Sequence, residues 1–193
     1  MKKFTFILFS IYLACGQAAF ADEFQKVKCG ADIPKALIGQ RSPNGRVVDT
    51  EKKYAALGLK HMGADEISDR LNSINWMICG NEYMVLVERR GAITDAVPFP
   101  EHSKAKPAFS GLCQSRGKDL PDIFAGVLDG ASKADMLPVV TAWKIDKQRA
   151  KFVKVPSEGL LCPRSGIYTV DGGLYSASKP GGGLRICDAC SKA

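Results

Sequence analysis

The chain has 193 residues, of which 46% are hydrophobic and 24% are charged, and its formal net charge is +7. This balance is that of an ordinary globular protein and excludes wholesale disorder. A chain of this length buries roughly 70% of its unfolded surface, so one domain with a sizeable core is expected without help from a metal or a partner chain.

The N-terminus has the three parts of a secretory signal peptide: a basic pair at 2–3, an apolar run over 4–14 and an Ala-Phe-Ala cleavage site at 19–21. The run is too short to span a bilayer, and no later segment is long enough, so the mature chain is not expected to be transmembrane. We predict cleavage after this tripeptide and export to the periplasm or the medium. A lipoprotein signal acylated at Cys15 ranks second, because Tyr12 stands where a lipobox has leucine.

Cys15 lies in this segment, which leaves six cysteines, an even number that predicts disulfides in an exported chain. The simplest pairing is Cys29–Cys79 with Cys113–Cys162, and the second choice is Cys29–Cys113 with Cys79–Cys162. The remaining two form a C-x-x-C motif and are expected to pair with each other or stay reactive. A redox or zinc role is disfavoured, because a redox motif follows a strand and opens a helix, and zinc needs further ligands. These two residues are Cys187 and Cys190.

The first half begins with an alternating stretch at 24–29 that predicts a strand, and 35–38 predicts a helical turn or an extended piece. Two short helices are expected, one over 50–57 that ends at Gly58 and one over 65–71 that comes after Gly63. The rest consists of short strands separated by turn residues. The predicted strands are 74–79, 83–88, 92–97, 112–113, 123–128, 139–145, 151–155 and 167–170.

These elements predict an α+β fold, mainly an antiparallel β meander with hairpins and two short helices in the first half, stabilised by disulfides. We expect one domain over 22–170. Beyond it, residues 171–193 are rich in glycine and predict a flexible tail that carries the C-x-x-C motif.

The sequence also suggests an internal duplication with halves 24–108 and 109–170. Residues 32–39 align without gaps on 119–126, and each half has a hairpin of the same length that ends in Val-Pro. The two Trp-x-Ile motifs, however, cannot be aligned together with these hairpins. Similar turn openers in two unrelated hairpins are the alternative interpretation.

Motifs for a serine nucleophile elbow, a zinc protease, a phosphate loop, a dinucleotide site and a calcium loop are all absent from the sequence. Of the two histidines, His61 is expected in a solvated loop. His102 lies among prolines next to Glu101 and Ser103 and is the one candidate general base, since proton transfer needs fixed geometry. Adjacent residues seldom face each other in a catalytic site, so a structural or exposed histidine is the favoured interpretation.

Basic residues gather in two of the predicted hairpins. Lysines on an edge strand deter pairing with another sheet, but the same residues predict an anion-binding surface. Nucleic acid is not the expected ligand, because Trp143 and Phe152 fit core positions rather than exposed stacking positions. The candidate anion-binding residues are Arg89, Arg90, Lys144, Lys147, Arg149 and Lys151.

The sequence therefore predicts an exported, non-catalytic binding or interaction protein of the cell envelope, without cofactor or metal. Its expected partner is an acidic protein or an anionic envelope polymer. The alternative is an exported hydrolase with His102 as general base, which would require a cleft at His102 and a carboxylate within hydrogen-bond reach. The ligand and the oligomeric state do not follow from the sequence.

Overall fold

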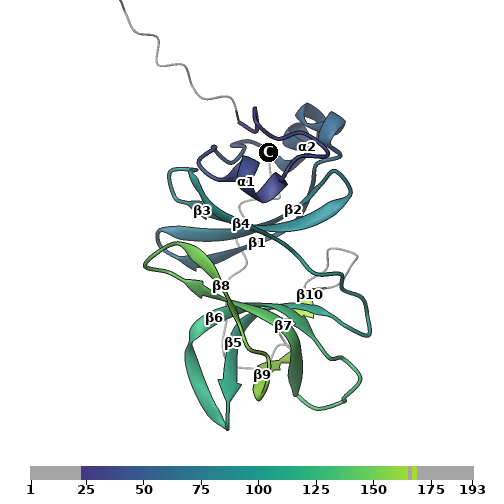
Figure 1. The fold of residues 1–193 in the computed structure, drawn as a ribbon, viewed down its shortest axis with the longest axis vertical. Helices are drawn as coiled ribbons and strands as arrows, with labels where there is room; N and C mark the ends of the chain where they lie inside the picture. The colour runs from purple at the N-terminus through teal and green to yellow at the C-terminus, as the bar shows by residue number, and fades with distance from the viewer. Residues whose placement is uncertain (1–22, 165–166, 169–193) are drawn as a thin grey trace, which may run out of the picture.

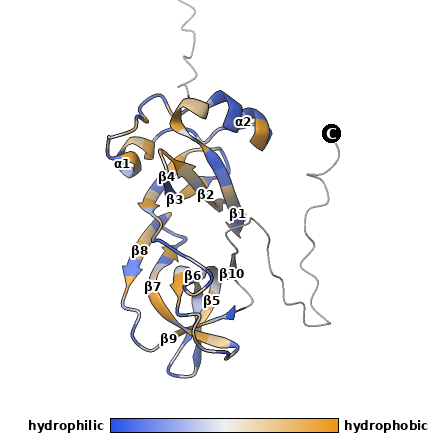
Figure 2. Ribbon diagram, turned by 90° about the vertical axis from the view of Figure 1, so that its right-hand side faces the viewer, coloured by the Kyte–Doolittle hydropathy of each residue, from blue (hydrophilic) through white to orange (hydrophobic). Residues whose placement is uncertain are grey.

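The structure is a computed structural model that describes residues 23–164 and 167–168. The predicted signal peptide and the tail from residue 171, with Cys187 and Cys190, lie outside the described residues. The described chain forms a short helical segment followed by two antiparallel sheets, and these three parts are stacked along the long axis (Figures 1 and 2).

Sheet 1 is a four-stranded meander that follows the helical segment in the chain. Asp32 caps the first helix by accepting a hydrogen bond from the Lys35 N–H, and Gly58, in the left-handed conformation at φ 60°, ends the helical segment. The helical segment consists of α1 (Ile33–Leu37), α2 (Val47–Lys53) and the 3-10 turn η1 (Ala55–Leu57). The strands of sheet 1 are β1 (Lys60–Ser68), β2 (Leu71–Ile78), β3 (Asn81–Glu88) and β4 (Ile93–Pro98).

Sheet 2 has the strand order β10-β5-β6-β7-β8, and β9 bonds to both β5 and β7, so β5, β6, β7 and β9 form a closed ring. Gly126 lies where two strands of this ring approach closely, and a Cβ there would collide with the Thr141 carbonyl oxygen. The strands are β5 (Ala108–Ser115), β6 (Lys118–Leu128), β7 (Met136–Asp146), β8 (Lys151–Val155), β9 (Leu160–Pro163) and β10 (Ile167–Tyr168).

Three apolar layers hold these parts together. The first lies between the helical segment and sheet 1, the second between the two sheets, and the third inside the ring of sheet 2. Strand β3 serves two of them, because all five residues from Tyr83 to Val87 are buried. Met84 and Leu86 face sheet 2, whereas Tyr83, Val85 and Val87 face the helical segment. A strand covered on both faces needs such an uninterrupted apolar run.

The two sheets are also joined by polar contacts of Asp95 in β4. Its carboxylate accepts a hydrogen bond from the backbone N–H of Phe152 at 2.8 Å and contacts the Lys151 ammonium at 3.4 Å. The same ammonium donates to the Thr94 carbonyl. Strand β8, which lies at the edge of sheet 2, is thereby held against sheet 1.

The structure contains disulfides Cys29–Cys79 and Cys113–Cys162, the pairing that the sequence ranks first. The first joins the segment before α1 to the end of β2. The second joins β5 to β9 inside the ring, and both its cysteines are buried. Disulfides of this kind indicate an oxidising environment such as that of exported proteins.

The predicted helix over 65–71 is wrong. These residues form the end of β1, a turn at Asp69–Arg70 and the start of β2. The helical spacing was misleading because Ile67 and Leu71, four residues apart, both reach the layer between the sheets from opposite sides of this turn.

The predicted strand over 24–29 is also wrong. Phe24 and Val27 are both buried in the first layer, but the chain reaches them through a turn in which the Val27 N–H donates to the Phe24 carbonyl. The structure does not show the internal duplication either. Residues 32–39 contain helix α1, whereas the matching 119–126 lie in strand β6.

His61 is not in a solvated loop, as expected from the sequence, but in β1. Its half-buried ring packs edge-on against Trp76 with 5.1 Å between the ring centroids. Burial lowers the pKa of His61 below 6.5, although the charge of Glu51 opposes this change. The folded state therefore favours the neutral ring.

Because the unfolded chain binds this proton more readily, the free energy of unfolding should fall as the pH drops below about 6.5. We expect His61→Gln to lose less stability than the wild type between about pH 7.5 and about pH 5.5, measured by urea unfolding. At the upper end of this range the pH should act equally on both proteins. Parallel losses throughout would contradict the inference.

Each disulfide closes a loop of about 50 residues, which the chain-entropy model values at about 4 kcal/mol. Replacing Cys113 and Cys162 together with serine should lower the free energy of unfolding by about this amount, and so should the Cys29 and Cys79 pair. Urea unfolding measures the losses, and non-reducing peptide mapping checks the pairing. A peptide that links Cys187 or Cys190 to any of the four would overturn this assignment.

Candidate functional site

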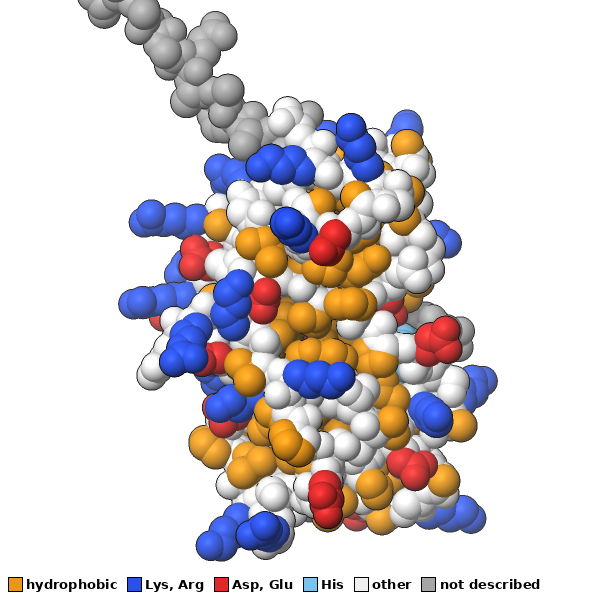
Figure 3. Space-filling model, viewed as in Figure 1, with side chains coloured by type: hydrophobic (Ala, Val, Ile, Leu, Met, Phe, Trp, Pro, Cys, Tyr) orange, Lys and Arg blue, Asp and Glu red, His pale blue; other side chains and the backbone are white. Residues whose placement is uncertain are grey.

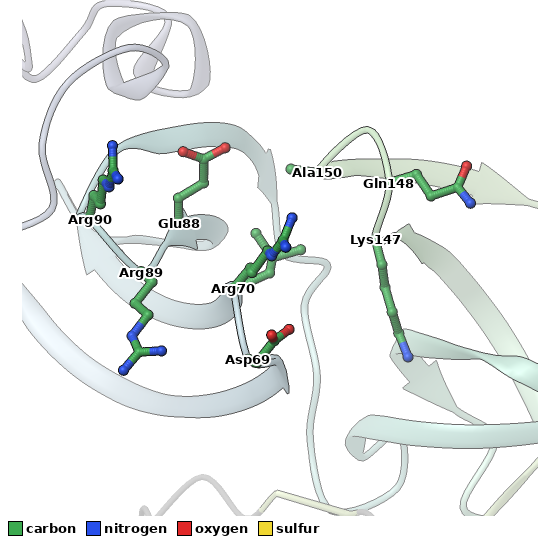
Figure 4. Close-up of a pocket in the computed structure, with 9 residues that line it drawn as sticks. Asp69, Arg70, Glu88, Arg89, Arg90, Lys147, Gln148 and Ala150 are labelled. Carbon is green, nitrogen blue, oxygen red and sulfur yellow. The ribbon is translucent and has the colours of Figure 1, made fainter.

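The tips of three hairpins meet at one edge of the molecule and line a pocket of about 540 Å³ (Figure 4). The turns 69–70 and 89–91 belong to sheet 1, and the turn 147–150 belongs to sheet 2. Since Leu71 pairs with Glu88, the two turns of sheet 1 lie side by side, and the Arg89 N–H donates to the Arg70 carbonyl. The pocket exists because the two sheets are stacked.

The turn of sheet 2 is shaped by Asp146, whose Oδ1 accepts hydrogen bonds from the backbone N–H groups of Gln148 and Arg149 at 3.0 Å each. The bond from Arg149 contributes most to lowering the pKa of Asp146, burial opposes it, and the bond from Gln148 adds to the lowering. In sheet 1, the Arg41 guanidinium donates to the Arg90 carbonyl at 2.9 Å. The backbone of each tip is therefore fixed, whereas its long side chains extend into solvent.

Four cationic side chains line this pocket, and none of them forms an ion pair with another residue of the described chain. In Figure 4, arginines lie on one side of the pocket and Lys147 and Gln148 on the other. The space-filling view shows lysine and arginine side chains projecting from the left-hand edge, level with the junction of the sheets (Figure 3). The four cations are Arg70, Arg89, Arg90 and Lys147.

Two carboxylates, Asp69 and Glu88, also line the pocket and likewise lack an ion pair within the described residues. Four bases against two acids leave the pocket with an excess of positive charge. Because all six side chains are exposed, the cations remain solvated and available to an anion from outside.

The structure brings together three of the six predicted anion-binding residues, which are Arg89, Arg90 and Lys147. The other three pair with carboxylates outside the pocket: Arg149 with Asp146 at 3.8 Å, Lys144 with Asp122 at 3.6 Å and Lys151 with Asp95 at 3.4 Å. The number of basic residues in the second hairpin therefore predicted more anion-binding residues than the structure places in the pocket.

Arg70 is the one cation of the pocket that the sequence does not predict, because residues 65–71 are expected to form a helix; the lining residues Asp69, Glu88 and Gln148 are not predicted either. The signal for a turn at this place is Asp69, a residue type that is common in turns.

His102 lies at the other end of β3, beside a second pocket of about 620 Å³. Its partner is Glu82 rather than the adjacent Glu101: the His102 Nε2 donates to Glu82 Oε2 at 2.7 Å. The carboxylate can only accept, so this nitrogen carries the proton. Glu82 Oε1 also accepts a hydrogen bond from the Asn75 amide at 3.1 Å, and the imidazole packs edge-on against Phe99.

The cleft and carboxylate required by the hydrolase alternative are thus present, but the ring nitrogens of His102 are not accessible. Nε2 is engaged by Glu82, and Nδ1 is buried without a hydrogen-bond partner in the described structure. A general base needs a free nitrogen within reach of the substrate proton. Together with the bond from the Phe99 N–H to the Glu82 carbonyl, this arrangement fastens the start of the linker between the sheets.

Comparison with protein-family models, with curated proteins and with solved structures finds no match for this chain. Among the described residues, no group of three or more His, Cys, Asp or Glu side chains could hold a metal ion. The described part of the chain also contains no helix with the length and apolar character needed to cross a membrane.

If His102 and Glu82 serve the structure, Glu82→Gln should lower the free energy of unfolding by about 1–3 kcal/mol, because it weakens a largely buried charged hydrogen bond. The matched control is Glu101→Gln, which makes the same change at an exposed neighbour and should leave stability unchanged. Urea unfolding of both variants measures the difference. Equal stability of the two would contradict the structural role.

Proposed function

We propose that this protein is an exported component of the cell envelope that binds an anionic partner, without catalysis, through the pocket at the three hairpin tips. The observation that carries the proposal is the set of four exposed cationic side chains, Arg70, Arg89, Arg90 and Lys147, that line one pocket and form no ion pair within the described residues. Export is supported by the signal-like segment 1–21 and by the two disulfides.

Three of these cations are arginines, whose planar guanidinium groups suit bidentate contacts with carboxylate or phosphate oxygens. An exposed ion pair contributes only about 0–1 kcal/mol. Useful affinity therefore requires several contacts at once, which a pocket built from three separate turns provides. Because the cations are exposed, salt should weaken the binding.

A hydrolase centred on His102 is disfavoured, because neither ring nitrogen is available to a substrate in its pocket. Within the described residues, the contacts of this histidine account for a structural role.

The proposal is tested by comparing Lys147→Glu with Arg149→Glu. Both residues are exposed in the same turn and both substitutions change the net charge equally, but only Lys147 lines the pocket. On phosphocellulose, Lys147→Glu should elute at lower salt than Arg149→Glu. In solution, its affinity for a soluble polyphosphate should fall roughly fivefold, the equivalent of about 1 kcal/mol.

Identical elution of the two variants would show that retention reflects overall charge rather than the pocket. A wild-type affinity that does not respond to salt would likewise overturn the proposal.

A further inference from the structure

On the basis of this proposed function, we infer that the ligand is a linear acidic polysaccharide, a chain that carries both carboxylates and hydroxyl groups. The first observation is that the site continues beyond the pocket of the three tips. A second hollow of about 330 Å³ adjoins it, and Lys147 and Gln148 line both. Because the two hollows share two lining residues of one turn, we treat them together as one track, which suits a chain better than a single small anion.

The second hollow also has charges of both signs, but several of them are paired, Lys144 with Asp122 at 3.6 Å and Asp146 with Arg149 at 3.8 Å. It is lined by Lys144 as well as by Lys147, and by the carboxylates of Asp122 and Asp146 together with the Gln148 amide. The two hollows together therefore present cationic donors, acceptor oxygens and the Gln148 amide.

The carboxylate oxygens in the pocket favour a ligand that carries hydroxyl groups over one that carries only negative charge. Asp69 and Glu88 lie among the arginines without ion-pair partners in the described chain, and they would repel a ligand that carries only negative charge. A carboxylate can accept hydrogen bonds from hydroxyl groups. A polyhydroxylated chain with regularly placed carboxylates satisfies both the cations and the acceptors of the track.

The apolar content of the track disfavours the other macromolecules. Its apolar lining residues are Leu71, Ala150 and Pro121, and no aromatic side chain of the described residues lines either hollow. A protein partner normally meets an apolar core with aromatic anchors, and a nucleic acid normally stacks its bases on aromatic rings. Charge and hydroxyl recognition remain as the chemistry that the track offers.

A chain that occupies both hollows makes more contacts than one that occupies a single hollow, so affinity should rise with chain length until both are filled. The experiment uses the mature protein and oligogalacturonates of increasing length, with affinities measured by calorimetry at fixed ionic strength. We expect at least about a tenfold gain from the monomer to a chain that spans both hollows. Polyglutamate with the same number of carboxylates should bind more weakly.

A variant pair reports on the second hollow. Lys144→Gln removes a cation that lines only this hollow, and it should weaken long chains but not short ones. The matched control is Lys133→Gln, which makes the same charge change at an exposed residue outside both hollows and should weaken neither.

The outcomes separate this inference from the proposed function. Affinity that does not depend on length, polyglutamate that binds as tightly as the polysaccharide, or equal effects of Lys144→Gln and Lys133→Gln would overturn the polysaccharide track. The proposed anion-binding function would still hold in that case, provided that Lys147→Glu weakens binding more than Arg149→Glu does. If no anion distinguishes Lys147→Glu from Arg149→Glu, the proposed function fails together with this inference.

Discussion

The apolar layer between the two sheets is the contact on which the rest of the structure depends. It buries one face of each sheet, and Met84 and Leu86 of β3 lie in it while their neighbours in the same strand face the helical segment. This stacking sets the turns of sheet 1 opposite the β7–β8 turn. Hydrophobic burial, which carries no directional information of its own, therefore determines which charged side chains line the same pocket.

The charged side chains at the two ends of β3 differ in burial. At one end, Glu82 is nearly buried and both of its oxygens accept hydrogen bonds, so little of its chemistry is left for a ligand. At the other end, Glu88 and its neighbours Arg89 and Arg90 are exposed. Buried polar groups must form their hydrogen bonds within the fold. Exposed charged groups bind water instead, and a ligand can replace this water at a small cost in free energy.

Much of the β framework and both described disulfides could be predicted from the sequence, because buried strands such as β3 leave long apolar runs bounded by turn residues. Edge and partly covered strands such as β1 leave a weaker pattern, which here mimicked a helix and hid Arg70. The sequence also does not reveal the hydrogen-bond partner of His102, since Glu82 comes from β3, a strand that is distant in sequence. The fold also determines which basic residues form ion pairs with nearby carboxylates, and the distribution of charge along the sequence does not show this.

Each of the described disulfides closes a loop on its own side of the apolar layer between the sheets. Cys29–Cys79 binds the segment before α1 to sheet 1, and Cys113–Cys162 closes the ring of sheet 2. In mechanical terms, the protein consists of two disulfide-reinforced bodies joined by a noncovalent seam and by the linker 99–107, and the hairpin tips straddle that seam. A pulling force that opened the seam would separate Arg70 and Arg89 from Lys147 without breaking either disulfide, so the pocket would be lost while each body kept its covalent cross-link.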